Sequence, residues 1–302
     1  MTHNHMEIEM TNTNIKRIFS LAVAAVLVAI AVPAAAQSEA RTTRKQIKAQ
    51  LGFVPSFFDQ MPDEALTAAW EYLGGLEMNT ETALPNKVKD LITVAVASQV
   101  PCEYCVYAGT KFASANGATK GQVKEAVVLA SLTRHWSTIL QGLDYSYATF
   151  KKEIDRAFSY AAEHHGEDKP RTIRTTADAY ADIKASFGFV PGFLRRFPKS
   201  AVAPMWKQLK NVQFAPDTNI EPKYKELIGL AVAAQIPCRY CVYSHTKAAK
   251  LYGATDAEIE EAVAMAGSVR FWSTYLHGSL IDNKTFRKDI DRLTKPAKSA
   301  RK

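Results

Sequence analysis

The segment Glu226–Gly253 reads ELIGLAVAAQIPCRYCVYSHTKAAKLYG, and it decides how the rest of the chain is interpreted. We predict two helices here, over residues 222–236 and 237–252. Pro222 suits the first turn of the first helix, because proline is well tolerated there, and an almost unbroken apolar run begins at Leu227. If Ile236-Pro237 forms a tight corner, the two helices run antiparallel.

The second of these helices opens with a dithiol. Cys238 falls in its first turn, where free backbone N–H groups and the positive end of the helix dipole stabilise a thiolate. Cys241 follows three residues later on the same face, so the two sulfurs can close a disulfide. His245 lies a further four residues along and can accept a thiol proton. The position at the helix start predicts that Cys238 is the more acidic and more exposed thiol, whereas the register with His245 favours Cys241 as the attacking one.

Glu226 completes this group of side chains from the preceding helix. At about 1.5 Å per residue, Glu226 lies about 16 Å from the corner and His245 about 12 Å from it. The antiparallel arrangement therefore predicts that the carboxylate lies near the imidazole. Glu226, His245 and Cys241 would then form a proton relay in which the carboxylate fixes the histidine tautomer.

With Gly253 added, the pattern is Glu-x11-Cys-x2-Cys-x3-His-x7-Gly, and it resembles the motif of the alkylhydroperoxidase D-like branch of the carboxymuconolactone decarboxylase superfamily. The resemblance implies an all-helical fold and a thiol peroxidase or disulfide reductase activity, without a metal or bound organic cofactor. It also implies that Cys241 attacks the peroxide, that Cys238 resolves the product, and that Glu226 and His245 form the relay. Some members carry a second histidine between the cysteines, where this chain has Arg239-Tyr240.

Most of the chain is a tandem repeat with an offset of 136 residues. Gly52-Phe53-Val54-Pro55 recurs as Gly188-Phe189-Val190-Pro191, and Trp136-Ser137-Thr138 recurs as Trp272-Ser273-Thr274. We therefore divide the chain into a signal peptide (1–36), repeat one (37–158), a linker (159–175), repeat two (176–294) and a basic tail (295–302).

The sequence pattern of both repeats predicts helices only. Thr255-x-x-Glu258 and Thr119-x-x-Gln122 are capping boxes that begin helices with apolar residues at steps of three and four. No segment shows the sustained alternation of a strand. The expected fold is all-α, with two alkylhydroperoxidase D-like repeats that each carry C-x-x-C at a helical corner.

Repeat one keeps the dithiol and changes its surroundings. Asp90, Cys102 and Cys105 occupy the positions of Glu226, Cys238 and Cys241, but Gly109 replaces His245. His135 can substitute as a base only if the following helix folds it over the dithiol. We therefore expect a weaker, altered or purely structural site in repeat one.

The N-terminal region resembles a signal peptide. Lys16 and Arg17 precede an apolar run over residues 18–32, and Ala34-Ala35-Ala36 forms a cleavage site before Gln37. We expect a periplasmic or secreted protein that begins near Gln37; a retained N-terminal anchor is the alternative. Met10 is an alternative start, because the residues before it do not suit the n-region of a signal peptide.

The chain has 302 residues, 47% of them hydrophobic, and a net charge of +8. It has no basic helix or aromatic platform of the kind that binds nucleic acid, so we expect no nucleic-acid partner. The expected partners are a peroxide and an external dithiol or protein reductant. By analogy with the family, a homo-oligomer is expected, and a trimer of this two-repeat chain would supply six helical units.

The sequence leaves several alternatives open. Cys238, Cys241, His245 and Glu226 could hold zinc, although structural zinc usually draws its ligands from separate segments. The two dithiols could be static bridges, although so short a loop stabilises little. His164-His165 could bind a metal or be a solvated linker pair.

The first interpretation is an exported thiol peroxidase. A thiol-disulfide oxidoreductase acting on proteins is the second, a lactone decarboxylase the third, and a disulfide-stapled binding module the non-enzymatic alternative.

Overall fold

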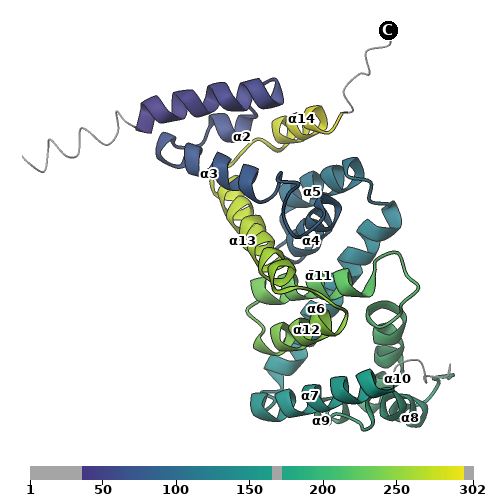
Figure 1. The fold of residues 1–302 in the computed structure, drawn as a ribbon. Coiled ribbons are helices and arrows are strands. Elements are labelled where there is room, and N and C mark those ends of the chain that lie inside the picture. The colour runs from purple at the N-terminus through teal and green to yellow at the C-terminus, as the bar shows by residue number, and fades with distance from the viewer. Residues whose placement is uncertain (1–35, 165–171, 296–302) are drawn as a thin grey trace, which may run out of the picture. The chain divides into compact units, whose positions relative to one another are not determined.

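The structure is a computed structural model that describes residues 36–164 and 172–295 (Figure 1). The described residues contain helices and turns and no strand, which confirms the all-α prediction. The described residues divide into two compact units, the first ending at Leu73 and the second beginning at Gly74.

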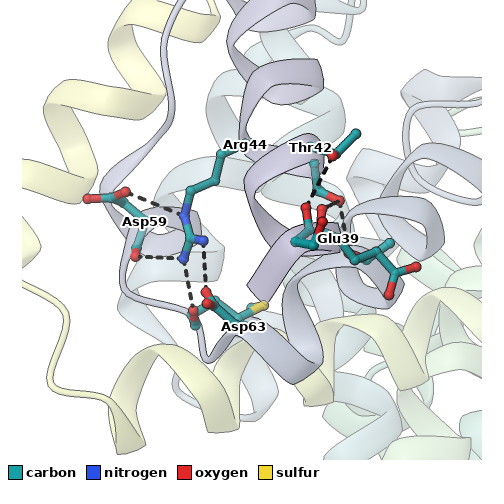
Figure 2. Close-up of polar contacts among 9 residues, drawn as sticks. Glu39, Thr42, Arg44, Asp59 and Asp63 are labelled. Atoms are coloured by element: carbon teal, nitrogen blue, oxygen red, sulfur yellow. Dashed lines mark hydrogen bonds and ion pairs between the residues drawn. The ribbon is translucent and has the colours of Figure 1, made fainter. Parts of the chain in front are cut away.

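The first unit holds a helix over residues 36–51, then α2 (Ser56–Asp59) and the start of α3 (Asp63–Gly75). Its core is built from apolar side chains, and the rings of Phe58 and Trp70 meet edge to face at 5.5 Å. Arg44 ties the helices together, because its guanidinium lies 2.8 Å from Asp63 and 3.7 Å from Asp59 (Figure 2).

The second unit holds the remaining helices in this order: α4 (Asn86–Gln99), α5 (Glu103–Ala115), α6 (Lys120–Gly142), α7 (Tyr147–Glu163), α8 (Thr176–Phe187), α9 (Gly192–Arg195), α10 (Lys199–Gln208), the π-helix η1 (Leu209–Gln213), α11 (Pro222–Gln235), α12 (Arg239–Leu251), α13 (Asp256–Gly278) and α14 (Asn283–Leu293). Helices α4 and α11 pack on each other, and each of them also packs on α6 and on α13.

Both dithiols lie at the corner of a helical hairpin, α4–α5 in repeat one and α11–α12 in repeat two. The corners have the same hydrogen bond, from Cys102 N–H to the Ala97 carbonyl at 2.9 Å and from Cys238 N–H to the Ala233 carbonyl at 3.0 Å. The two helices predicted around Pro237 are confirmed, with Cys238 as the N-cap of α12.

The long helices α6 and α13 begin as predicted. Thr119 and Gln122 form a reciprocal capping box at the start of α6, and Thr255 and Glu258 form the same box at the start of α13. Each helix follows a dithiol hairpin along the chain and packs against the hairpins of both repeats.

The repeats exchange their last helices, so that α7 packs on α12 and α14 packs on α5. Tyr240 on α12 donates to the Tyr145 carbonyl at 2.5 Å, and Tyr104 on α5 donates to the Ile281 carbonyl at 2.7 Å. Each dithiol helix is therefore covered by a helix of the other repeat.

Two buried ion pairs also join the repeats. The ammonium of Lys89 lies 3.0 Å from Glu261, and that of Lys225 lies 3.3 Å from Glu125. Both lysine side chains are almost fully buried, and both ammonium groups also donate to backbone carbonyls. Because a buried charge requires a partner, these pairs hold α4 against α13 and α11 against α6, in each case a helix of the other repeat.

Candidate functional site

The sulfurs of Cys238 and Cys241 lie within disulfide distance, with their Cα atoms 5.4 Å apart. Cys238 Sγ also accepts the backbone N–H of Cys241 at 3.2 Å, so the sulfur acts as the helix cap. The prediction that Cys238 is the more exposed thiol is wrong, because Cys238 is 0% exposed and Cys241 is 3% exposed. The corner folds Cys238 inward, and the cap interaction keeps its sulfur against the helix.

His245 and Glu226 are in direct contact, as the antiparallel arrangement predicts. The imidazole Nδ1 lies 2.7 Å from Glu226 Oε2, and the other carboxylate oxygen accepts the side-chain amide of Gln213 at 2.7 Å. Glu226 is buried and the His245 side chain is 12% exposed. With both oxygens engaged, the carboxylate fixes the ring and leaves Nε2 as the nitrogen available for proton transfer.

Repeat one contributes to this site through α6. The hydroxyl of Thr133 lies 3.3 Å from His245 Nε2, and the Thr133 carbonyl lies 4.0 Å from Cys241 Sγ. Thr133 is 112 residues from His245 in the sequence. The corresponding residue of repeat two is Val269, so the dithiol site of repeat one (site one) has no equivalent of the Thr133 hydroxyl.

A cavity of about 120 Å³ lies beside Cys241 within the second unit. Cys241, His245 and Glu226 line it, whereas Cys238 does not. Its other walls are predominantly apolar and aromatic and come from both repeats, among them Trp136, Phe150, Phe193, Trp206 and Phe214. A small apolar molecule in this cavity would meet Cys241 and the imidazole together.

The imidazole fits here because α11 carries a glycine opposite it. A Cβ atom on Gly229 would lie 2.6 Å from His245 Nδ1 and 2.7 Å from Nε2. In repeat one the arrangement is reversed. Gly109 occupies the histidine position, and a Cβ there would lie 3.0 Å from the Thr93 methyl group and 3.1 Å from a methyl group of Val94.

The corresponding site in repeat one contains carboxyl groups and no histidine. Asp90 accepts the side-chain amide of Asn116 at 2.7 Å, and burial raises the pKa of Asp90 to about 7. Glu77, at the position of Gln213, accepts hydrogen bonds from Ser268 and from the indole of Trp272, and burial raises the pKa of Glu77 as well.

The dithiol of repeat one has the same local geometry as that of repeat two. Cys102 and Cys105 lie within disulfide distance with their Cα atoms 5.3 Å apart, and Cys102 Sγ accepts the Cys105 N–H at 3.1 Å. Site one therefore combines a dithiol with acids, whereas site two combines it with a histidine–glutamate pair.

The other histidines considered from the sequence lie elsewhere. The His135 ring is in contact with Trp136 and Phe197, and burial lowers its pKa. His164 stacks on Tyr160, and His165 lies outside the described residues. Within residues 36–164 and 172–295, no group of three or more His, Cys, Asp or Glu side chains is arranged to hold a metal ion.

Sequence reasoning missed three side chains of this site: Thr133, Trp136 and Gln213. A signal for two of them was present in the repeat alignment. At the 136-residue offset Thr133 aligns with Val269, and Gln213 aligns with Glu77. A hydroxyl is therefore present in only one repeat at the first position, and a carboxyl group in only one repeat at the second. Trp136 is the same residue in both repeats and gave no such signal.

The predicted signal peptide and most of the basic tail lie outside the described residues. Among the helices that the structure describes, none has the length and hydropathy needed to cross a membrane. The proposed cleavage site near Gln37 therefore stays a prediction.

Two segments, residues 64–146 and 200–281, match the profile of the carboxymuconolactone decarboxylase family. A 71-residue segment is 37% identical to "Uncharacterized protein 4 in cox locus" of Paracoccus denitrificans, and the match covers 24% of this chain and 63% of that protein. The fold matches a protein from Burkholderia xenovorans LB400 that carries the provisional name of a gamma-carboxymuconolactone decarboxylase subunit. That match has a TM-score of 0.51 and 17% identity, and covers 83% of this chain and 99% of that one.

Proposed function

Because the chain belongs to the carboxymuconolactone decarboxylase family, whose members include decarboxylases and alkylhydroperoxidase D-type peroxidases, we propose that it is a thiol-dependent peroxidase. The observation that carries this proposal is the 2.7 Å contact between Glu226 and His245, in a cavity that these two residues line together with Cys241. Repeat two supplies the reacting thiols, and repeat one supplies part of the cavity wall.

In the first step, His245 Nε2 accepts the proton of the reduced Cys241 thiol, and Glu226 stabilises the resulting imidazolium through Nδ1–H. The thiolate attacks one peroxide oxygen and the O–O bond breaks. The leaving oxygen takes the proton and departs as an alcohol or water, which leaves a sulfenic acid on Cys241.

In the second step, Cys238 attacks the Cys241 sulfur. An S–S bond forms, the S–O bond breaks, and the hydroxyl group leaves as water with the Cys238 proton. An external dithiol then reduces the disulfide by exchange and is itself oxidised. Export through the N-terminal segment would place this cycle in the periplasm or outside the cell, and assembly into a homo-oligomer is part of the same proposal.

The burial of Cys238 and Cys241, which are 0% and 3% exposed, favours a small peroxide over a protein disulfide as the substrate. For the same reason it favours a small dithiol over a bulky protein as the reductant. Decarboxylation of an anionic lactone has less support. The described cavity lining contains no lysine or arginine to pair with a carboxylate.

The test is peroxide consumption by the reduced protein in the presence of dithiol reductants. Cys241→Ser should abolish turnover, and Cys238→Ser should accumulate a sulfenic acid on Cys241 that dimedone labels. Dimedone labelling of Cys238 in the Cys241→Ser variant would show that the two roles are reversed. A wild-type protein that consumes neither hydrogen peroxide nor cumene hydroperoxide would refute the proposal.

A further inference from the structure

The cavity wall contains a hydrogen-bond donor that the peroxidase steps above do not use. Trp136 on α6 lines the cavity, and its indole nitrogen Nε1 is buried without a hydrogen-bond partner. Its ring is held in place by Phe193 and Phe197, whose centroids both lie 5.9 Å from it. A buried N–H without an acceptor is unfavourable and rare in folded proteins, so a bound ligand that accepts from Trp136 would remove this cost.

The other repeat shows what such an indole binds when an acceptor is present. Trp272 is the residue 136 positions after Trp136, and its Nε1 donates to a carboxylate oxygen of Glu77 at 3.0 Å. The counterpart of Glu77 beside the cavity is Gln213, whose amide is directed to Glu226 at 2.7 Å. Gln213 makes its hydrogen bond to Glu226 rather than to the indole, so the Trp136 donor is left free.

The donor lies in a wall whose other members suit an organic group. Trp206 also lines the cavity, but its Nε1 donates to Asp182 at 2.7 Å and is not free for a ligand. Phe150, Phe193 and Phe214 add aromatic surface, and Cys241 with His245 forms the reactive end. A ligand with an apolar body and one oxygen acceptor would match both the rings and the free N–H.

We propose that Trp136 is a substrate-binding residue whose indole N–H donates to an oxygen of an organic hydroperoxide, and to the hydroxyl oxygen of the alcohol that the reaction leaves. This inference rests on the proposed peroxidase function for the identity of the ligand. The hydrogen bond holds the oxygen end of the molecule near Cys241, while the aromatic rings bind the organic group. The bound oxygen takes the place that Glu77 has in repeat one.

The test uses the indole N–H resonances of the ¹⁵N-labelled full chain, because the sequence has four tryptophans and so four such signals. Trp136→Phe and Trp206→Phe assign two of them. The probe is 2-phenyl-2-propanol, the alcohol left by cumene hydroperoxide, added to the oxidised protein. Isopropylbenzene, which has the same apolar body without the hydroxyl, is the control ligand.

We expect 2-phenyl-2-propanol to move the Trp136 resonance downfield in a saturable way, with the Trp206 resonance moving less, and isopropylbenzene to cause no downfield shift. An equal shift with both ligands, or no shift up to the solubility limit, would overturn the inference. Neither outcome depends on turnover, so failure of the peroxidase assay alone refutes only the proposed function.

Kinetics and stability supply a second readout. Trp136→Phe should lower kcat/KM for cumene hydroperoxide by about tenfold, as expected for the loss of one hydrogen bond, and should leave the pH profile unchanged. Its melting temperature should fall less than that of Trp206→Phe, which removes a bonded N–H as well as ring contacts. Equal destabilisation by the two variants would mean that Trp136 has a partner within the protein, and the inference would fail.

Discussion

Gly229 on α11 and His245 on α12 are in mutual steric contact, and the imidazole occupies the space where a side chain on residue 229 would lie. A Cβ atom added to Gly229 would be 2.6 Å from Nδ1, the nitrogen that contacts Glu226 at 2.7 Å. In repeat one the space is filled from the opposite helix, by Thr93 against Gly109. The space between the two helices of each hairpin thus accommodates one side chain. It comes from α12 in repeat two and from α4 in repeat one.

Gly229→Ala should therefore displace the imidazole and break its contact with Glu226. We expect peroxide turnover to fall by about 10²- to 10⁴-fold, the range for loss of a general base. Steady-state rates of cumene hydroperoxide consumption measure this. Gly267→Ala is the matched control, because Gly267 is exposed on α13 with nothing within 4 Å of an added Cβ. The steric argument fails if Gly229→Ala retains full turnover.

Gly109→His alone should not create an active first site, because Thr93 and Val94 already occupy the space. We expect this variant to be destabilised, and the added change Thr93→Gly to recover part of the loss. The coupling energy from urea unfolding of both single variants and the double variant is the measurement, with about 0.5–3 kcal/mol expected for residues in contact. Strictly additive effects would contradict the reversed packing.

The two dithiols should contribute unequally to turnover. Replacing Cys102 and Cys105 together by serine should have little effect, since site one has no histidine. His245→Gly should lower turnover by about 10²- to 10⁴-fold. Rates of peroxide consumption for these variants, each checked for native helical content, decide between the alternatives. Equal losses from disabling either dithiol would indicate that the two sites act in series.

Asp90 should make the protein less stable as the pH rises. Burial raises the pKa of its carboxyl to about 7 in the folded chain, whereas an unfolded aspartate ionises at a pKa of about 3.9. The unfolded chain thus releases this proton first. The contribution of Asp90 is fully present below about pH 4 and is lost as the pH rises through about 7.

Asp90→Asn removes that ionisation, so the variant should lose less stability than the wild type between pH 4.5 and pH 8. Urea unfolding at these two pH values is the measurement. Asp282→Asn is the control with the opposite sign, because hydrogen bonds from Thr285 lower the pKa of this exposed cap residue. A pH dependence that is the same in Asp90→Asn and the wild type would contradict the raised pKa.

Helix geometry and capping rules account for what the sequence alone predicted. The contact between Glu226 and His245 joins residues only 19 apart, and two helices with a tight corner between them fix it. The capping boxes of α6 and α13 depend on residues three positions apart. Aligning the repeats at an offset of 136 residues identifies the dithiol of repeat one and shows that it lacks the histidine. This alignment compares residue identities along the chain and requires no knowledge of contacts in space.

Tertiary structure decided the rest of the site. Helical periodicity shows that a face is apolar but not which helix covers it. The sequence therefore did not reveal that Thr133 and Trp136 of repeat one reach the dithiol of repeat two, or that α7 and α14 are exchanged. The burial of Cys238 was mispredicted for a related reason: a helix start is exposed in isolation, and only the packing of the whole hairpin against its neighbours encloses it.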